Sequence, residues 1–296
     1  MSKKTLSTGV FERWGDDSIS PSMFYAIIAF VLVWGFGLTA FLADYAINIG
    51  FMPDLLTIIF VGLVVPIIGI IVACKSNNAI ISFIGYNLIV GPLGFLLGPV
   101  LNQYSPDVVK NALEITFACT VVFGVLGIVF PSFFSKIGRV LFVSLLSLLV
   151  IRVLQIFIPS LDFVWIDYLA ALLFSLYIGF DMYRANTMQK TFDNAVDICV
   201  DFYLDILNLF LIILRILGKS KWNMAGVSQP FFNLICLSIY LVINIFNFYF
   251  SISTFSWHFW NNCFINIFFE YWIIIFIFIS CHVFFVFVYA FNFSCF

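Results

Sequence analysis

Long apolar stretches separated by short polar connections dominate the first two thirds of this sequence. A window of about 19 residues identifies six of them, each long enough to cross the hydrocarbon core of a bilayer as a helix. Lipid offers no partner to a free backbone N–H or C=O group, so spanning segments of this kind are expected to be helical. The six predicted spans are Phe24–Ala43, Leu55–Cys74, Ala79–Leu101, Leu113–Phe130, Val140–Ile158 and Phe163–Met182. The pattern therefore predicts an all-α, polytopic membrane protein.

A seventh apolar stretch, Val196–Leu217, differs from the others because polar residues interrupt it. At about 100° per residue these polar positions fall within one arc of about 80° on a helical wheel. They are Asp197, Asp201, Asp205, Asn208 and Arg215. Charged side chains are costly inside a membrane and commonly line an ion or proton path, so this stripe is a candidate ion path. The alternative is an amphipathic helix on the membrane surface with Asp181 as a solvated cap, although such helices usually carry Lys and Arg beside their polar face.

Composition excludes several classes of protein. Hydrophobic residues make up 64% of the chain and charged residues 9%, and the mean hydropathy is +1.14, which no water-soluble fold matches. The net charge is −2 and the sequence has no basic stripe, so nucleic acid is not an expected partner. No Ser/His/Asp or HExxH pattern is present, and we therefore expect no enzymatic activity and no cofactor.

Basic residues in the connections predict the orientation of the chain. Eight of them fall on the side of the N-terminus, namely Lys3, Lys4, Arg13, Lys75, Lys136, Arg139, Arg184 and Lys190, and only Lys110 falls on the other. Because cytoplasmic loops are enriched in Lys and Arg, the N-terminal segment 1–23 is expected in the cytoplasm. Arg215, Lys219 and Lys221 oppose this assignment, since a spanning seventh helix would put all three outside. A re-entrant seventh segment would keep them inside, and both arrangements remain open.

The composition changes abruptly near Trp222. The last 75 residues contain 18 Phe, no Lys or Arg, and Glu270 as the one acidic residue. Two stretches, Phe231–Phe250 and Tyr271–Ala290, are apolar enough to predict one or two extra helices. We interpret the extension 219–296 either as an unselected addition, of the kind that AT-rich DNA encodes, or as a pair of lipid-facing helices.

Spacing brings two of the aspartates together. Asp181 and Asp205 each lie twelve residues from Asp193, so an antiparallel hairpin that turns there would place both at the same height, roughly 18 Å from the turn. Two carboxylates in one poorly solvated site cannot both ionise cheaply, and the pair would hold one proton. When ionised, the pair is a candidate site for a hard cation such as calcium, with Asp201 and Asn208 as further oxygen donors.

Three motifs carry a resemblance to a known family. They are Tyr177-Ile178-Gly179-Phe180-Asp181, the stretch Tyr203-Leu204-Asp205-Ile206-Leu207-Asn208-Leu209-Phe210, and Leu214-Arg215-Ile216-Leu217-Gly218. With Leu38-Thr39-Ala40-Phe41 and the stretch from Glu114 to Gly127, they resemble the Bax inhibitor-1 family, also called the transmembrane Bax inhibitor motif family, and its bacterial branch in particular. The resemblance covers residues 24–218. It implies a seven-helix membrane domain over that range, with a central seventh helix wrapped by the other six.

The resemblance also implies a function. Members of the family act as pH-sensitive calcium leak channels in which a hydrogen-bonded aspartate pair responds to protonation, and those positions correspond to Asp181 and Asp205. Bacterial relatives latch this pair with an arginine at the cytoplasmic end of the second segment. This sequence has Lys75 there, and a lysine cannot form a bidentate fork with a carboxylate. Asp201 is an additional acid.

The expected function is therefore a pH-sensitive calcium or cation leak channel in a bacterial plasma membrane, gated by the Asp181–Asp205 pair. The supporting polar groups of the ion path are expected to be Asp197, Asp201, Asn208, Arg215 and Lys75. Two alternatives stay open. One is a non-conducting membrane regulator of stress or quality control, which would act through membrane protein partners, and the other is a proton-coupled cation exchanger.

Overall fold

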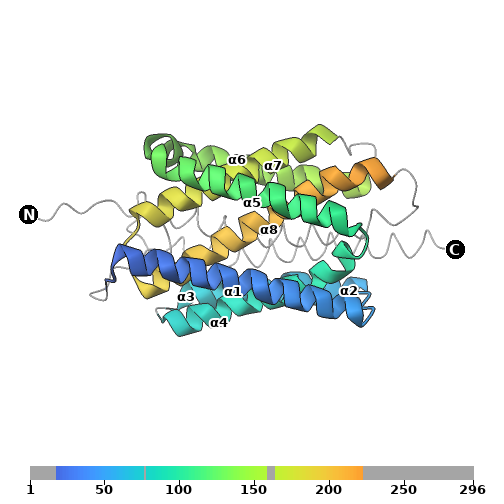
Figure 1. Ribbon diagram of the computed structural model, residues 1–296, viewed down its shortest axis with the longest axis horizontal. Helices are drawn as coiled ribbons and strands as arrows, with labels where there is room; N and C mark the ends of the chain where they lie inside the picture. The colour runs from blue at the N-terminus through green and yellow to red at the C-terminus, as the bar shows by residue number, and fades with distance from the viewer. Residues whose placement is uncertain (1–17, 77, 159–163, 223–296) are drawn as a thin grey trace, which may run out of the picture. The chain divides into compact units, whose positions relative to one another are not determined.

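Seven helical passes lie side by side in residues 18–76, 78–158 and 164–222, which are the residues that the computed structural model describes (Figure 1). The second pass is divided into α2 (Leu55–Ile59), the π-helical turn η1 (Phe60–Val64) and α3 (Val65–Lys75). The others are α1 (Pro21–Asn48), α4 (Ala79–Leu101), α5 (Pro106–Val129), α6 (Pro131–Phe157), α7 (Val164–Thr187) and α8 (Phe192–Trp222). No strand occurs in these ranges, which confirms the all-α, polytopic architecture. The helices predicted at Phe231–Phe250 and Tyr271–Ala290 lie outside the described residues.

Six of the described helical passes are long and apolar enough to cross a membrane, and they correspond to the six predicted spans. The helices are longer than the hydropathy pattern indicates. α5 begins at Pro106 and α6 at Pro131, whereas the predicted spans begin at Leu113 and Val140. A proline is favourable in the first turn of a helix, where no intrahelical partner is needed for its missing N–H. A hydropathy window registers only the apolar part of such a helix and omits its polar first turns.

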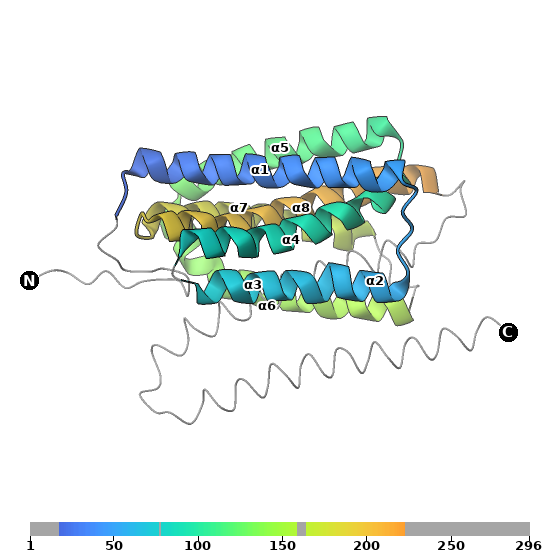
Figure 2. The same cartoon turned by 90° about the horizontal axis from the view of Figure 1, so that it is seen from below.

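The seventh pass, α8, is the central helix of the bundle. Its 31 residues form one uninterrupted helix, about 46 Å long at 1.5 Å per residue. It runs from the end of the bundle where α7 finishes to the end where α7 begins (Figures 1 and 2). From Asp193 to Arg215 every side chain is buried except the half-buried Ile206. The structure therefore has a helix that traverses the bundle, in place of a re-entrant segment or a surface helix.

Five of the other passes supply the surroundings of α8. It packs against α7, α1, α5, α4 and α3, while α6 packs mainly on α7. The central position expected for the seventh helix is confirmed. Its polar stripe is accordingly enclosed by protein and kept away from lipid.

Small residues allow the helices around α8 to approach closely, as is common in membrane bundles. A Cβ atom added to Gly94 would lie 2.8 Å from Thr39 Cα, and one added to Gly98 would lie 2.6 Å from the Ala43 carbonyl oxygen. At these two glycines, therefore, the backbone of α1 packs directly against α4. The tightest approach to a backbone atom joins α5 to α7, where a Cβ on Gly127 would lie 2.1 Å from the Gly179 carbonyl oxygen.

A lysine closes the turn between α7 and α8. Lys190 Nζ donates hydrogen bonds to the carbonyl oxygens of Ala185, Asn186 and Met188 at 2.6, 2.9 and 3.0 Å. The same ammonium lies 4.9 Å from the centre of the Phe24 ring in the first turn of α1. Lys190 thus satisfies the carbonyl groups at the C-terminal end of α7 and joins this turn to α1.

The contact between Gly127 and Gly179 predicts a strong effect of a single methyl group. We expect Gly127→Ala to lower the free energy of unfolding by about 1–3 kcal/mol, because the methyl group would meet backbone atoms that cannot move aside. Thermal unfolding of the detergent-solubilised protein measures the effect. Gly37→Ala in α1 is the matched control, since an added Cβ there meets nothing within 4 Å. Equal unfolding temperatures of the two variants would contradict the proposed close packing.

Candidate functional site

Two aspartates of α7 and α8 meet in the interior of the bundle. Asp181 and Asp205 are 2% and 3% exposed, and their carboxyl groups are neighbours. An ionised carboxylate accepts hydrogen bonds but cannot donate one, so a hydrogen bond between the two groups would require a proton on one of them. If Asp181 is ionised and no proton is shared, its buried Oδ2 atom receives no hydrogen bond. Two neighbouring buried carboxyl groups form an arrangement that can hold one proton between them.

The counter-charge of this pair comes from α7 itself. Arg184 Nη1 donates to Asp181 Oδ1 at 3.2 Å and to Asp201 Oδ2 at 2.7 Å, and the guanidinium joins α7 to α8. All three side chains are buried. Buried charges are tolerated only when they are paired and hydrogen-bonded, so Arg184 is what allows two neighbouring acids to stay ionised. The sequence interpretation assigned Arg184 to a cytoplasmic loop, although its i, i+3 spacing from Asp181 indicates that both side chains share a helix face.

The turn of the α7–α8 hairpin lies earlier than the sequence predicts. α7 ends at Thr187 and α8 begins at Phe192, so the chain reverses before it reaches Asp193. The earlier turn brings Asp201 closer to the level of Asp181 than the predicted turn does, which explains why Arg184 contacts both. Asp193 itself accepts a hydrogen bond from the Ser82 hydroxyl of α4 at 2.9 Å.

The other residues of the predicted stripe are buried as well. Asp197 is 2% exposed in the early part of α8. Asn208 is 1% exposed, and its side-chain amide donates to the Leu204 carbonyl oxygen of the same helix at 2.6 Å. In this conformation the amide of Asn208 therefore binds its own backbone and not a carboxylate of the pair.

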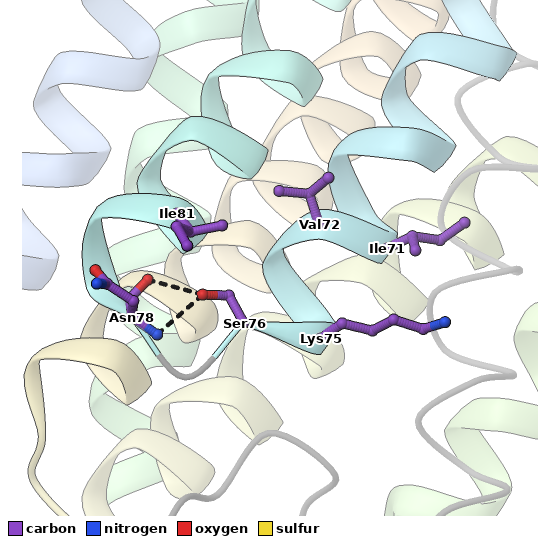
Figure 3. A pocket seen from close by; sticks show the side chains of 6 residues that line it. All are labelled: Ile71, Val72, Lys75, Ser76, Asn78 and Ile81. Atoms are coloured by element: carbon purple, nitrogen blue, oxygen red, sulfur yellow. Dashed lines mark hydrogen bonds between the residues drawn. The ribbon is translucent and has the colours of Figure 1, made fainter.

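Lys75 is not brought to the aspartates. It is exposed at the C-terminal end of α3, beside a groove of about 560 Å³ lined by Ile71, Val72, Lys75, Ser76, Asn78 and Ile81. Figure 3 shows its side chain extending away from the hydrogen-bonded Ser76 and Asn78. The basic group that contacts the aspartates in this structure is Arg184.

A second buried charge cluster occupies the opposite end of the α7–α8 pair. Asp167 at the start of α7 binds Arg152 of α6 at 2.6 Å and lies 3.5 Å from Arg215 Nε near the end of α8. Gln155 accepts a further hydrogen bond from Arg152 at 3.0 Å. Arg215 is thus paired inside the bundle. This pairing explains how α8 can carry a basic residue near its end and still traverse the bundle.

The face of α8 that is turned away from the aspartates is held by hydroxyl groups. The hydroxyls of Tyr203 and Thr39 of α1 are 2.8 Å apart, and the Tyr203 ring packs edge-on against Tyr86 of α4. The Tyr86 hydroxyl donates to the Val31 carbonyl oxygen at 3.2 Å. These bonds fix α8 against α1 and α4, so its acidic face is directed to α7.

Calcium coordination by Asp181 and Asp205 stays a prediction. Within residues 18–76, 78–158 and 164–222, no three His, Cys, Asp or Glu side chains form a group that could hold a metal ion. The pair supplies carboxylate oxygens of the type that calcium prefers, and a complete coordination shell would need further oxygen ligands.

Comparison with known proteins identifies the family of this chain. The family model described as "Inhibitor of apoptosis-promoting Bax1" matches residues 22–222, close to the full described bundle. The chain belongs to the Bax inhibitor-1 family. The predicted resemblance is confirmed, and with it an integral, multi-pass membrane protein.

Relatives within the Bax inhibitor-1 family come from bacteria and yeast. An uncharacterised protein of Helicobacter pylori is 35% identical over 127 residues, which cover 42% of this chain and 53% of the relative. An uncharacterised membrane protein of Vibrio cholerae is 31% identical over 155 residues, 50% of this chain and 69% of the relative. Bax inhibitor 1 of Schizosaccharomyces pombe is 30% identical over 132 residues, 44% of this chain and 49% of that protein. The chain thus spans about half the length of the Helicobacter and yeast relatives.

Removal of the acid from the second charge cluster is expected to destabilise the bundle. Asp167→Asn would remove the carboxylate that pairs with both the Arg152 and the Arg215 guanidinium groups, and we expect a loss of about 3–5 kcal/mol in the free energy of unfolding. Chemical or thermal unfolding in detergent measures this loss. Glu114→Gln is the control, because its ion pair with Lys110 is exposed and should be worth less than about 1 kcal/mol. Similar losses in both variants would refute the structural role of the cluster.

Proposed function

We propose that this member of the Bax inhibitor-1 family is a passive cation leak channel, with calcium as the transported ion, controlled by protonation of Asp181 and Asp205. The observation that supports it is the buried carboxyl pair between α7 and the central helix α8. A shared proton in a water-poor interior is a natural pH-responsive contact between two helices. The proposal involves no chemical conversion of a substrate.

The balance of charge in the cluster suggests the direction of control. When the pair loses its proton, the carboxylates of Asp181, Asp201 and Asp205 carry three negative charges against the one positive charge of Arg184. The excess negative charge repels the two helices and attracts cations, and carboxylates bind calcium only when deprotonated. We therefore assign conduction to the ionised pair and closure to the protonated pair.

Two further expectations belong to the same proposal. The basic residues Lys75, Lys136, Arg139, Arg184 and Lys190 all belong to the end of the bundle where α1 begins (Figure 1). By the positive-inside rule this end would face the cytoplasm. We propose the plasma membrane of a bacterium as the location, on the basis of the bacterial relatives.

Calcium flux in liposomes tests the proposal. The full chain would be reconstituted in vesicles that contain a calcium dye, with equal pH on both sides, at several values between about 5 and 8. We expect dye signal that rises with pH. No flux at any pH would sink the channel proposal. Flux that appears only with a proton gradient would point to an exchanger, and capture of a membrane protein partner without any flux would point to a regulator.

Removal of the shared proton site should abolish the pH response. We expect flux through Asp205→Asn to stay constant between about pH 5 and 8, because an amide at this position neither ionises nor shares the proton. The control is Asp44→Asn, an exposed acid of α1 that should keep the wild-type pH profile. A pH response of normal size in Asp205→Asn would contradict the assignment of the pair.

Loss of the counter-charge should move the response to higher pH. Without the guanidinium, the carboxylates of Asp181 and Asp201 lose their positive partner and hold protons more tightly. For Arg184→Gln we expect the midpoint of the flux curve to rise by about 1–3 pH units. Lys136→Gln, which removes an exposed charge at the same end of the bundle, should leave the midpoint unchanged. An unchanged midpoint in Arg184→Gln would show that Arg184 does not influence the pair.

A further inference from the structure

Tyr177 carries a buried hydroxyl group that the bundle leaves without a partner. Its side chain is 4% exposed, and its Oη atom has no hydrogen bond. The other buried tyrosines of the core are satisfied, since the Tyr203 hydroxyl meets Thr39 and the Tyr86 hydroxyl meets the Val31 carbonyl group. A buried polar group without a partner costs free energy, so an orphan hydroxyl of this kind needs an explanation.

The surroundings of Tyr177 point to the aspartate cluster. Tyr177 lies four residues before Asp181 on α7, and positions i and i+4 share one face of a helix. The acidic groups near its hydroxyl are Asp181 on the same helix and Asp201 and Asp205 on α8. Arg184 completes the set of charges at this interface of α7 and α8.

Two residues beyond Tyr177, Gly179 brings α7 close to α5 and α6. The groups nearest to Gly179 are the Gly127 backbone, the Phe123 carbonyl and the Phe134 ring, which carry no charge. An unpartnered donor therefore lies one helical turn from an unpartnered acceptor, because Asp181 Oδ2 also receives no hydrogen bond. Both belong to an interface whose remaining charges are already paired through Arg184.

We propose that the Tyr177 hydroxyl donates a hydrogen bond to the Asp181–Asp205 pair once the pair has lost its proton, and that Tyr177 is thus a positioning residue that sets the pH of the switch. While the pair holds its proton, the carboxyl groups carry less negative charge and attract the hydroxyl less strongly, and the hydroxyl stays without a partner, as it is in this structure. When the proton leaves, the pair gains acceptor capacity, and the hydroxyl rotates to donate directly or through one water molecule. Tyr177 keeps its own proton throughout.

The test is Tyr177→Phe in the full chain. This change removes the donor and keeps the ring, so the ionised pair loses a hydrogen bond and forms less readily. We expect the midpoint of deprotonation to rise by about one pH unit, a tenfold change in proton affinity. If the protein conducts as proposed, the pH dependence of calcium flux reports the midpoint of deprotonation, and in this respect the inference rests on the proposed function. The infrared C=O band of the protonated carboxyl, assigned by its loss in Asp205→Asn, reports it without any flux.

Tyr203→Phe is the matched control. Tyr203 lies two residues before Asp205 on the same helix, but its hydroxyl is engaged with Thr39 on the opposite face. We expect its infrared midpoint to equal that of the wild-type protein. An unchanged midpoint in Tyr177→Phe, or equal shifts in both variants, overturns the inference. If the wild-type chain conducts nothing but the infrared midpoint still moves in Tyr177→Phe alone, the channel proposal fails and the role of Tyr177 stands.

Stability provides a second criterion. Below the midpoint the hydroxyl has no partner to lose, so Tyr177→Phe should unfold at the same or a higher temperature than the wild-type protein at about pH 5. A marked loss of stability at that pH would mean that the hydroxyl is already bonded in the protonated state. That result would also overturn the inference.

Discussion

The bond of Arg184 to Asp181 and Asp201 is the interaction on which the rest of the structure depends. Three aspartates lie buried where α7 meets α8, and burial of uncompensated charge in an apolar bundle costs several kcal/mol per group. The Arg184 guanidinium reduces this cost, and under the proposed function a proton shared by Asp181 and Asp205 reduces it further. Such a proton would make the interface sensitive to pH, because it can leave whereas the charge of the arginine stays.

This constraint accounts for the central position of α8. A helix with acids at three successive turns cannot present them to lipid, where no water or counter-charge would stabilise them. It is instead enclosed by α1, α3, α4, α5 and α7, and its acidic stripe faces α7. The glycines of α4 and α5 permit this enclosure because they let neighbouring backbones approach without side chains between them.

Hydropathy and spacing predict the architecture well for physical reasons. The six apolar spans follow directly from the free energy of transfer to lipid, and the meeting of Asp181 with Asp205 follows from the antiparallel course of two consecutive helices. The ends of helices are harder to predict, since the polar first turns of α6, with Lys136 and Arg139, resemble loop composition. For the same reason, the sequence did not predict that Arg184 lies in α7 and pairs with Asp181 and Asp201. A hydropathy window ends the sixth span at Met182, whereas the helix continues to Thr187 and turns Arg184 inward.

The hydrogen bonds of Lys190 at the α7–α8 turn limit how these two helices can separate. Three carbonyl groups of the turn and the Phe24 ring of α1 are held by one ammonium group, only six residues beyond Arg184. With that end fastened, any separation of α7 from α8 would be smallest beside Lys190. At the other end, the ion pair of Asp167 with Arg215 joins the same two helices, so both ends of the α7–α8 pair are held by buried polar contacts.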